Sequence, residues 1–253
     1  MSLTALKRAG LLGLAAAALL SATAGAALVE VDGLVLRANG GFQPQALPRH
    51  RYAPIHFRGH FDIGTKRGAE PQKLEQAVIK FDRDGRLDVT GLPRCAPEKI
   101  AAADTEQARR ICRRAIVGTG TVGAKIPLGF GTVNASVPLT VFNGPRLDGN
   151  PTAILHAQTL LPFPETYAIV APIERQAGRY RYRVTIDVPP IAGGFGRLTR
   201  LEVSIGRRYR SGGRERSYVS ARCTDNVLET HGHFTFDGGT VIDGDVEKYC
   251  RIL

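Results

Sequence analysis

Segments of alternating apolar and polar residues, separated by Gly and Pro, run from Leu28 to the end of the chain. A period of two is typical of a strand with one buried face. The clearest segments are TVNASVPLTVF, TAILHAQTLL, TYAIVAPIE, RYRYRVTIDV, LTRLEVSIGRRYR and ERSYVSARC. About a dozen such strands with one short helix predict an all-β protein, built as an antiparallel β-sandwich or a jelly-roll-like fold.

The last two predicted strands flank the turn Asp237-Gly238-Gly239, whose glycines supply the positive φ angles that a tight hairpin needs. Leu228, Phe234 and Phe236 share one face of the first strand, and the polar residues Glu229, His231, His233 and Thr235 share the other. Across the turn, the hairpin is expected to place four residues on the phenylalanine face: Ile242, Gly244, Val246 and Cys250.

One short α-helix is predicted near residues 97–115. Asp104 is placed to cap the segment TEQARRICRR, which has Glu106 in its first turn and arginines in its last. This order of charges suits the helix dipole. We expect the helix to dock onto the strand ends through Cys112.

The first residues predict an exported protein. Lys7 and Arg8 precede the apolar run 9–20 and a stretch of small residues, as in a secretory signal peptide. Cleavage is expected after Ala24 or Ala26, so we assign residues 1–26 to the signal and residues 27–253 to a single β-rich domain. An uncleaved membrane anchor is the alternative, but the apolar run is shorter than the ~20 residues that a span requires.

Export gives the four cysteines, Cys95, Cys112, Cys223 and Cys250, an oxidising compartment that favours disulfides. Three pairings exist, and we favour the neighbours in sequence, each closing a loop worth ~3 kcal/mol by chain entropy. A zinc site is the alternative, but the chain has no Cys-x-x-Cys pair.

The chain is strongly basic, with a net charge of +11. Removal of Lys7 and Arg8 with the signal lowers the 34 basic residues to 32 against 23 acidic ones, which leaves +9. One cluster lies at the end of the predicted helix and consists of Arg109, Arg110, Arg113 and Arg114. The other forms a hairpin around Ser211-Gly212-Gly213 that carries five arginines: Arg207, Arg208, Arg210, Arg214 and Arg216. The simplest interpretation is a solvated surface, and the specific hypothesis is an anion-binding hairpin.

Other candidate chemistry has weaker support. Gly118-x-Gly120-x-x-Gly123 matches a dinucleotide fingerprint, but the residues after it do not form a helix and no cofactor is expected. His231 and His233 share a strand face, as do the carboxylates of Asp243, Asp245 and Glu247. We interpret both sets as an exposed polar face rather than a zinc or calcium site, and predict no metal. The usual hydrolase motifs are absent from the sequence, so no catalytic residue is assigned.

Several segments together are similar to a group of exported proteins of uncharacterised function from high-GC Gram-positive bacteria: GLPRC, QARRIC, AIVGTGTVGAKI, LTVFNG, PPIAGGFGRL, IGRRYRSGGRERSYVSARC and GHFTFDGGTVIDGDVEKYC. The resemblance covers nearly all of the chain after the signal. It implies a shared fold and paired cysteines, and it carries over no activity, ligand or catalytic residue.

We therefore predict a secreted, non-enzymatic β-sandwich protein that is associated with the cell envelope. Its expected partner is an anionic cell-wall polymer or a membrane surface, bound through the basic hairpin, with no specific nucleic acid. The alternative is an extracellular hydrolase that acts on envelope polysaccharide or lipid. The sequence leaves the ligand and the oligomeric state open.

Overall fold

The computed structural model describes residues 26–129 and 131–253 and is dominated by one antiparallel sheet of twelve strands. In order across the sheet these are β1 (Ala27–Val31), β2 (Leu34–Gln43), β5 (His56–Thr65), β13 (Arg197–Ile205), β8 (Ile116–Leu128), β9 (Gly131–Asn143), β10 (Thr152–Thr159), β11 (Glu165–Arg175), β12 (Tyr180–Asp187), β6 (Leu74–Asp82), β17 (Val227–Phe236) and β18 (Val241–Tyr249).

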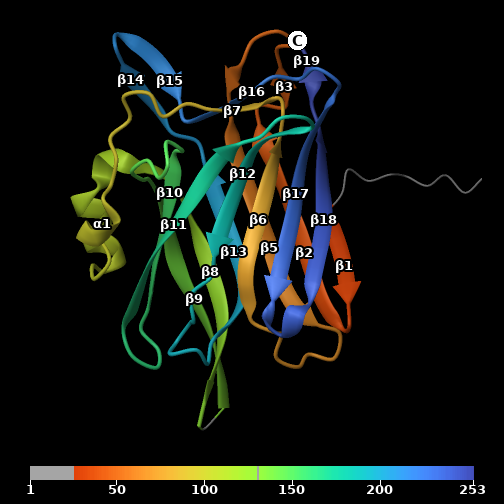
Figure 1. Ribbon diagram of the computed structural model, residues 1–253, viewed down its shortest axis with the longest axis vertical. Coiled ribbons are helices and arrows are strands. Elements are labelled where there is room, and N and C mark those ends of the chain that lie inside the picture. The colour runs from red at the N-terminus through yellow and green to blue at the C-terminus, as the bar shows by residue number, and fades with distance from the viewer. Residues whose placement is uncertain (1–25, 130) are drawn as a thin grey trace, which may run out of the picture.

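Three smaller sheets lie at one end of the molecule (Figure 1). They are β3 (Ala46–Leu47) with β19 (Arg251–Ile252), β4 (Ala53–Pro54) with β16 (Val219–Ala221) and β7 (Gly85–Leu87), and β14 (Arg208–Ser211) with β15 (Arg214–Ser217). Pro54 ends β4 before β5 begins, as expected of a residue that cannot donate to a strand ladder.

The large sheet curls round into two facing layers, with β11, β12, β6 and β17 in front of β13, β5 and β2 (Figure 1). Its two edge strands pack together, because a Cβ built on Gly244 of β18 would lie 3.3 Å from the Cβ of Ala27 of β1. The result is a nearly closed, barrel-like sandwich, which confirms the predicted all-β antiparallel fold. In the part of the chain that the structure describes, no helix is long and apolar enough to span a membrane.

The interior is filled from both layers by the apolar faces of the strands. Phe234 of β17 meets Phe61 of β5 edge to face, with ring centroids 5.2 Å apart, and both rings are buried. The predicted hairpin register is confirmed, since Phe234 lies opposite Ile242 and Gly232 opposite Gly244. The alternation of apolar residues in the sequence therefore gives the correct inward face for these strands.

The segment 95–115 covers the outer face of β9 and β10 instead of docking on the strand ends, which corrects that expectation (Figure 1). It holds two 3₁₀ turns, η1 (Pro97–Lys99) and η2 (Arg113–Ala115), and between them the α-helix α1 (Thr105–Ile111). Asp104 caps α1 through a capping box with Gln107, as predicted. The Ala-rich run before Asp104 is not α-helical, so the helix is only seven residues long.

The disulfides Cys95–Cys112 and Cys223–Cys250 are both present, which confirms the pairing of neighbours. The sequence also predicts a hairpin at the Asp82–Gly85 turn and an inward face formed by Tyr180 and Tyr182, and both predictions are wrong. The Asp82–Gly85 turn does not form a hairpin, because β6 continues in the large sheet while β7 pairs with β16. A bulge between Tyr180 and Tyr182 places Tyr182 inside the sandwich and Tyr180 outside, against Glu229. The predicted signal peptide, apart from Ala26, lies outside the described residues.

His156 of β10 attaches the 95–115 segment to the sheet. The side chain is fully buried, and Nε2 donates to the carbonyl oxygens of Ile100 (3.1 Å) and Ala103 (3.2 Å). The other ring nitrogen, Nδ1, has no partner among the described residues. Burial lowers the pKa of His156, because a proton on Nδ1 would be enclosed without an acceptor.

The sign of this shift predicts an acid-sensitive contribution to stability. The unfolded chain binds a proton at His156 more readily than the folded chain, so stabilisation is complete above about pH 6.5 and is lost as the pH falls towards the folded pKa. We expect His156→Gln to flatten the fall in melting temperature between pH 7.5 and 5.5, measured by calorimetry. His50→Gln, at an exposed position, should leave the profile unchanged, and an unchanged profile for His156→Gln would contradict the assignment.

Candidate functional site

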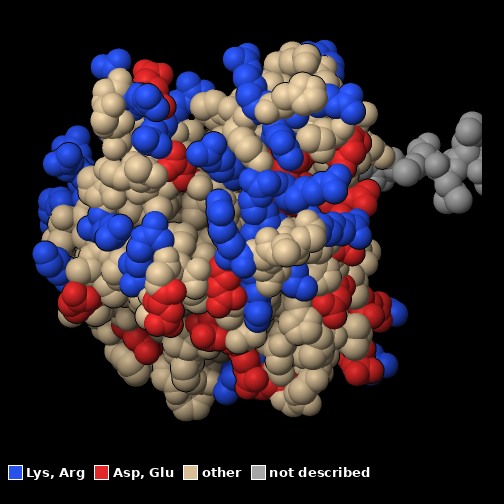
Figure 2. Space-filling view, turned by 45° about the horizontal axis from the view of Figure 1, so that its top comes forward, with Lys and Arg blue, Asp and Glu red and all other residues tan. Residues whose placement is uncertain are grey.

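Basic side chains gather at the end of the molecule that carries the three small sheets. Figure 2 shows Lys and Arg spread over the upper part of this view, with Asp and Glu mainly below them. Two structures make up the basic end, the predicted β14–β15 hairpin and a second cluster around Tyr52 that the sequence analysis did not identify.

The predicted hairpin is present, with Ser211 opposite Arg214 across the turn. Its five arginines do not act alike. Arg208, Arg210 and Arg214 are exposed and make no ion pair within the described part of the chain, while Arg207 is half-buried. Arg216 turns inward to Asp88, at 2.8 Å. The hairpin thus offers three arginines to solvent instead of five.

Arg216 and Asp88 fix the base of the hairpin. Burial alone would raise the pKa of Asp88, but hydrogen bonds from Thr90 and the charge of Arg216 outweigh it and hold the pKa below its usual value. Tyr209 also donates its hydroxyl to the Asp88 carbonyl, at 2.9 Å. The hairpin is therefore anchored to the segment that follows β7.

The second basic feature is the Tyr52 cluster, formed by Tyr52, Arg86, Arg181 and Arg222. Three guanidinium groups surround one ring, with their Cζ atoms 5.5, 5.4 and 5.3 Å from the centroid for Arg86, Arg181 and Arg222. Arg181 also donates to the Tyr52 hydroxyl, at 2.5 Å. Three cations this close repel one another, and only Arg222 has a carboxylate partner among the described residues. The cluster is thus well suited to an added anion.

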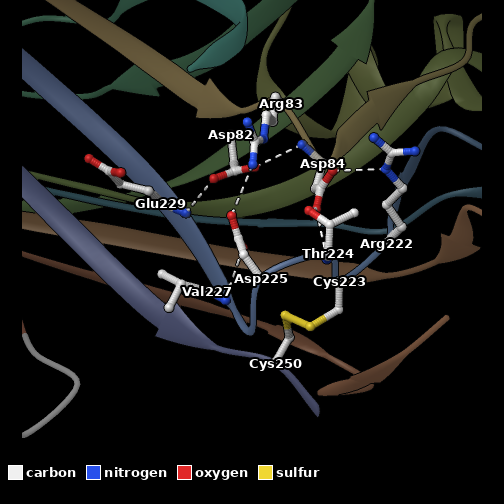
Figure 3. Close-up of a disulfide and its surroundings, with 10 residues drawn as sticks. All are labelled: Asp82, Arg83, Asp84, Arg222, Cys223, Thr224, Asp225, Val227, Glu229 and Cys250. Atoms are coloured by element: carbon white, nitrogen blue, oxygen red, sulfur yellow. Dashed lines mark hydrogen bonds and ion pairs between the residues drawn. A yellow bond between two sulfur atoms is a disulfide. The ribbon is translucent and has the colours of Figure 1, made fainter. Parts of the chain in front are cut away.

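Asp84 holds Arg222 of this cluster and is 1 % exposed (Figure 3). Its carboxylate accepts from Arg222 Nε at 2.8 Å, from the Thr224 amide at 2.9 Å and from the Thr224 hydroxyl at 2.5 Å. These bonds hold the turn after β6 against residues 222–224, next to the Cys223–Cys250 disulfide. From the sequence, Asp84 is simply a turn residue, because its partners lie about 140 positions away in the chain.

Beneath the small β4–β16–β7 sheet, the sandwich contains an apolar cavity of about 270 Å³ that is partly open to solvent. Its walls include Phe57, Phe81, Val203 and Tyr218. A smaller apolar hollow of about 90 Å³ continues below it and shares Phe61 and Leu155 as lining. A hollow of the larger size is unusual in a protein interior, which is otherwise close-packed.

Glycines at inward positions help to keep the cavity open. Gly40 of β2 lies opposite Gly59 of β5, and Gly232 of β17 lies opposite Gly244 of β18. All four line the larger cavity. A Cβ on Gly232 would lie 2.5 Å from the ring of Phe234, so the ring can occupy its position only because residue 232 has no side chain. In the sequence, this cavity is indicated by a glycine at an inward-facing position of each of these strands.

The cavity reaches a seam in the wall between β2 and β18. β1 pairs with β2 only as far as Ala38, and β18 pairs only with β17, so no backbone ladder joins 39–43 to 245–249 within the described chain. β3 and β19 pair above the seam. Gly40 and Gly41 line the cavity on one side of it, and Val246 and Lys248 on the other.

The remaining predicted candidates lie on outer faces. His231 and His233 of β17 face Asp245 and Asp243 of β18, with Nδ1–carboxylate distances of 2.8 Å in both pairs. Among the described residues no group of three or more His, Cys, Asp or Glu side chains is arranged to hold a metal ion. The Gly118–Gly123 fingerprint lies within β8, where no helix follows it.

Comparisons of the chain with protein-family models, curated proteins and solved structures found no match. The resemblance to exported proteins of high-GC Gram-positive bacteria therefore stays a prediction.

Proposed function

We propose that this protein is an exported, non-enzymatic binding protein whose basic end holds an anionic polymer of the cell envelope. The observation that carries the proposal is a set of arginines at one end that have no carboxylate partner within residues 26–129 and 131–253: Arg208, Arg210 and Arg214 on the hairpin, and Arg86 and Arg181 at Tyr52. Export is supported by the sequence of residues 1–26 and by two disulfides, which persist in oxidising compartments.

Geometry favours a polymer over a small anion at the hairpin. Arg208 and Arg210 lie on β14 and Arg214 lies on β15, opposite Ser211, so the three exposed arginines present charge over a surface instead of converging on one point. Repeated anions along a chain can meet several such charges at once, and each contact adds to the overall attraction. Tyr52 and its arginines then offer a more compact place for one anionic group at the same end.

The hydrolase alternative has less support. A polysaccharide hydrolase of the usual kind needs two carboxylic acids facing one cleft. The described residues that line the two interior cavities include no Asp or Glu. The alternative therefore stays a prediction without a supporting cluster.

The proposal is tested by retention on immobilised polyphosphate. We expect the protein to be retained at low salt and released as the screening length falls from about 10 Å at 0.1 M to about 3 Å at 1 M salt. Reversal of Arg208, Arg210 and Arg214 to Glu should weaken binding at least about tenfold, since each basic residue near an anionic surface contributes about 1 kcal/mol.

A matched control comes from the exposed arginines near α1. Arg110→Glu, Arg113→Glu and Arg114→Glu together change the net charge by the same amount at a different place on the surface. This variant should retain most of the binding. Equal losses of binding in the two variants would show that total charge alone governs retention. Retention of the wild type that does not depend on salt, or no retention at all, would contradict the proposal.

A further inference from the structure

The interior cavity serves no purpose in polymer binding at the surface, yet it is a large departure from close packing in the sandwich. Its lining is almost wholly apolar, with walls contributed by β5, β6, β12 and β13. An apolar cavity of ~150 Å³ stays dry and takes up benzene or xenon, and this one has about 270 Å³. Its chemistry selects a hydrocarbon ligand.

The charged side chains among the lining residues are all basic. Arg86 of β7 lies at the upper end, and Lys248 follows Val246 on the inward face of β18, beside the seam. No Asp or Glu of the described chain lines the cavity. A ligand that fills the apolar part therefore meets positive charge where the cavity approaches the surface, which is complementary to an anionic head group.

Tyr218 adds a polar group within the apolar wall. The residue is 2 % exposed and lines the cavity, and its hydroxyl has no hydrogen-bond partner among the described residues. Burial raises its pKa far above the usual value, so the hydroxyl stays protonated. Native proteins rarely leave such a donor unpaired.

We propose that the cavity binds a single-chain anionic amphiphile, with its hydrocarbon chain between the two layers and its carboxylate or phosphate at Lys248 and Arg86. The seam between β2 and β18 is the entry path, because Gly40 and Gly41 present no side chain there and no backbone ladder of the described chain closes it. The smaller hollow below, which shares Phe61 and Leu155, gives a longer chain room to continue.

The inference shares only Arg86 with the proposed polymer-binding surface, and binding of defined amphiphiles to the full mature protein tests it. Hexadecanoate and hexadecyl phosphate should each bind with one-to-one stoichiometry by titration calorimetry, and the tighter of the two identifies the head group. Hexadecyltrimethylammonium should bind much more weakly than either. Lys248→Met should weaken binding of the anions about fivefold, the effect of one basic charge near an anionic group.

Two variants fill the cavity from different walls, Val246→Phe at the seam and Val203→Phe on β13. Each should abolish amphiphile binding while retention on polyphosphate is kept, whereas the Arg208, Arg210 and Arg214 reversal should do the opposite. Glu247→Phe adds the same ring on the exposed outer face of β18 and should bind normally. Absence of wild-type binding to both anions, or unchanged binding in both filling variants, would overturn the inference.

Discussion

Phe234→Ala is expected to lower the free energy of unfolding by about 3–5 kcal/mol, the usual loss when a buried aromatic ring is removed. Phe234 is 2 % exposed, packs edge to face with Phe61 and lines the larger cavity. The space left by the ring would not be refilled easily by its neighbours. Gly232 beside it has no side chain that could move into the space, and a cavity already lies next to it. The expected loss therefore falls towards the upper end of this range.

Urea unfolding followed by circular dichroism measures the effect. Thr235→Ala changes the neighbouring residue on the outer face of the same strand and should cost less than about 1 kcal/mol. Phe234→Leu keeps part of the apolar volume and should fall between the two. A loss below about 1 kcal/mol for Phe234→Ala would show that the ring is not part of the packed interior.

The C-terminal hairpin shows how far local pattern can predict this fold. Alternation identifies Phe234 and Phe236 as inward residues, and the Asp237–Gly239 turn sets the register with β18, because both signals lie within a short stretch of chain. The same kind of local signal predicts the Asp104 cap and the Ser211–Gly213 hairpin. These features depend on neighbours in sequence, and they are correct in the structure.

Pairings between distant segments were beyond such reasoning. β6 lies between β12 and β17 in the sheet, although it precedes both by about a hundred residues or more. The periodicity of one strand does not indicate which other strand it pairs with. The closure of the sheet, and with it the cavity, depends on all of these pairings at once. The Tyr52 cluster has the same origin, since its three arginines come from β7, β12 and the segment after β16.

One signal in the sequence was available and was not used. In TAILHAQTLL the residues on both strand faces are apolar or uncharged, which predicts a strand covered on both sides. The structure places Ala153 and Ala157 inside the sandwich and buries Ile154 and His156 beneath the 95–115 segment. A two-sided apolar strand therefore indicates where a covering segment packs on the outer face.

Asp84→Ala is expected to cost about 2–4 kcal/mol. Removing one member of a buried ion pair typically costs 3–5 kcal/mol, and the smaller figure allows for the Arg222 side chain, which is 30 % exposed and regains water. The Thr224 amide and hydroxyl also lose their acceptor in a buried place. Because Asp84 holds residues 222–224 against the turn after β6, its loss should also loosen Arg222 from Tyr52 and weaken retention on polyphosphate.

A neighbouring ion pair on the same turn provides the comparison. Arg83 and Asp225 lie 3.2 Å apart, with side chains 56 % and 54 % exposed, and Asp225→Ala should cost less than about 1 kcal/mol. Asp84→Asn keeps the shape and one oxygen acceptor, so it should fall between the two alanine variants. Urea unfolding of the three variants gives the comparison directly. Equal costs for Asp84→Ala and Asp225→Ala would mean that water reaches Asp84 in solution, and the basic end would then lack the rigid support that its arginines need to face a ligand together.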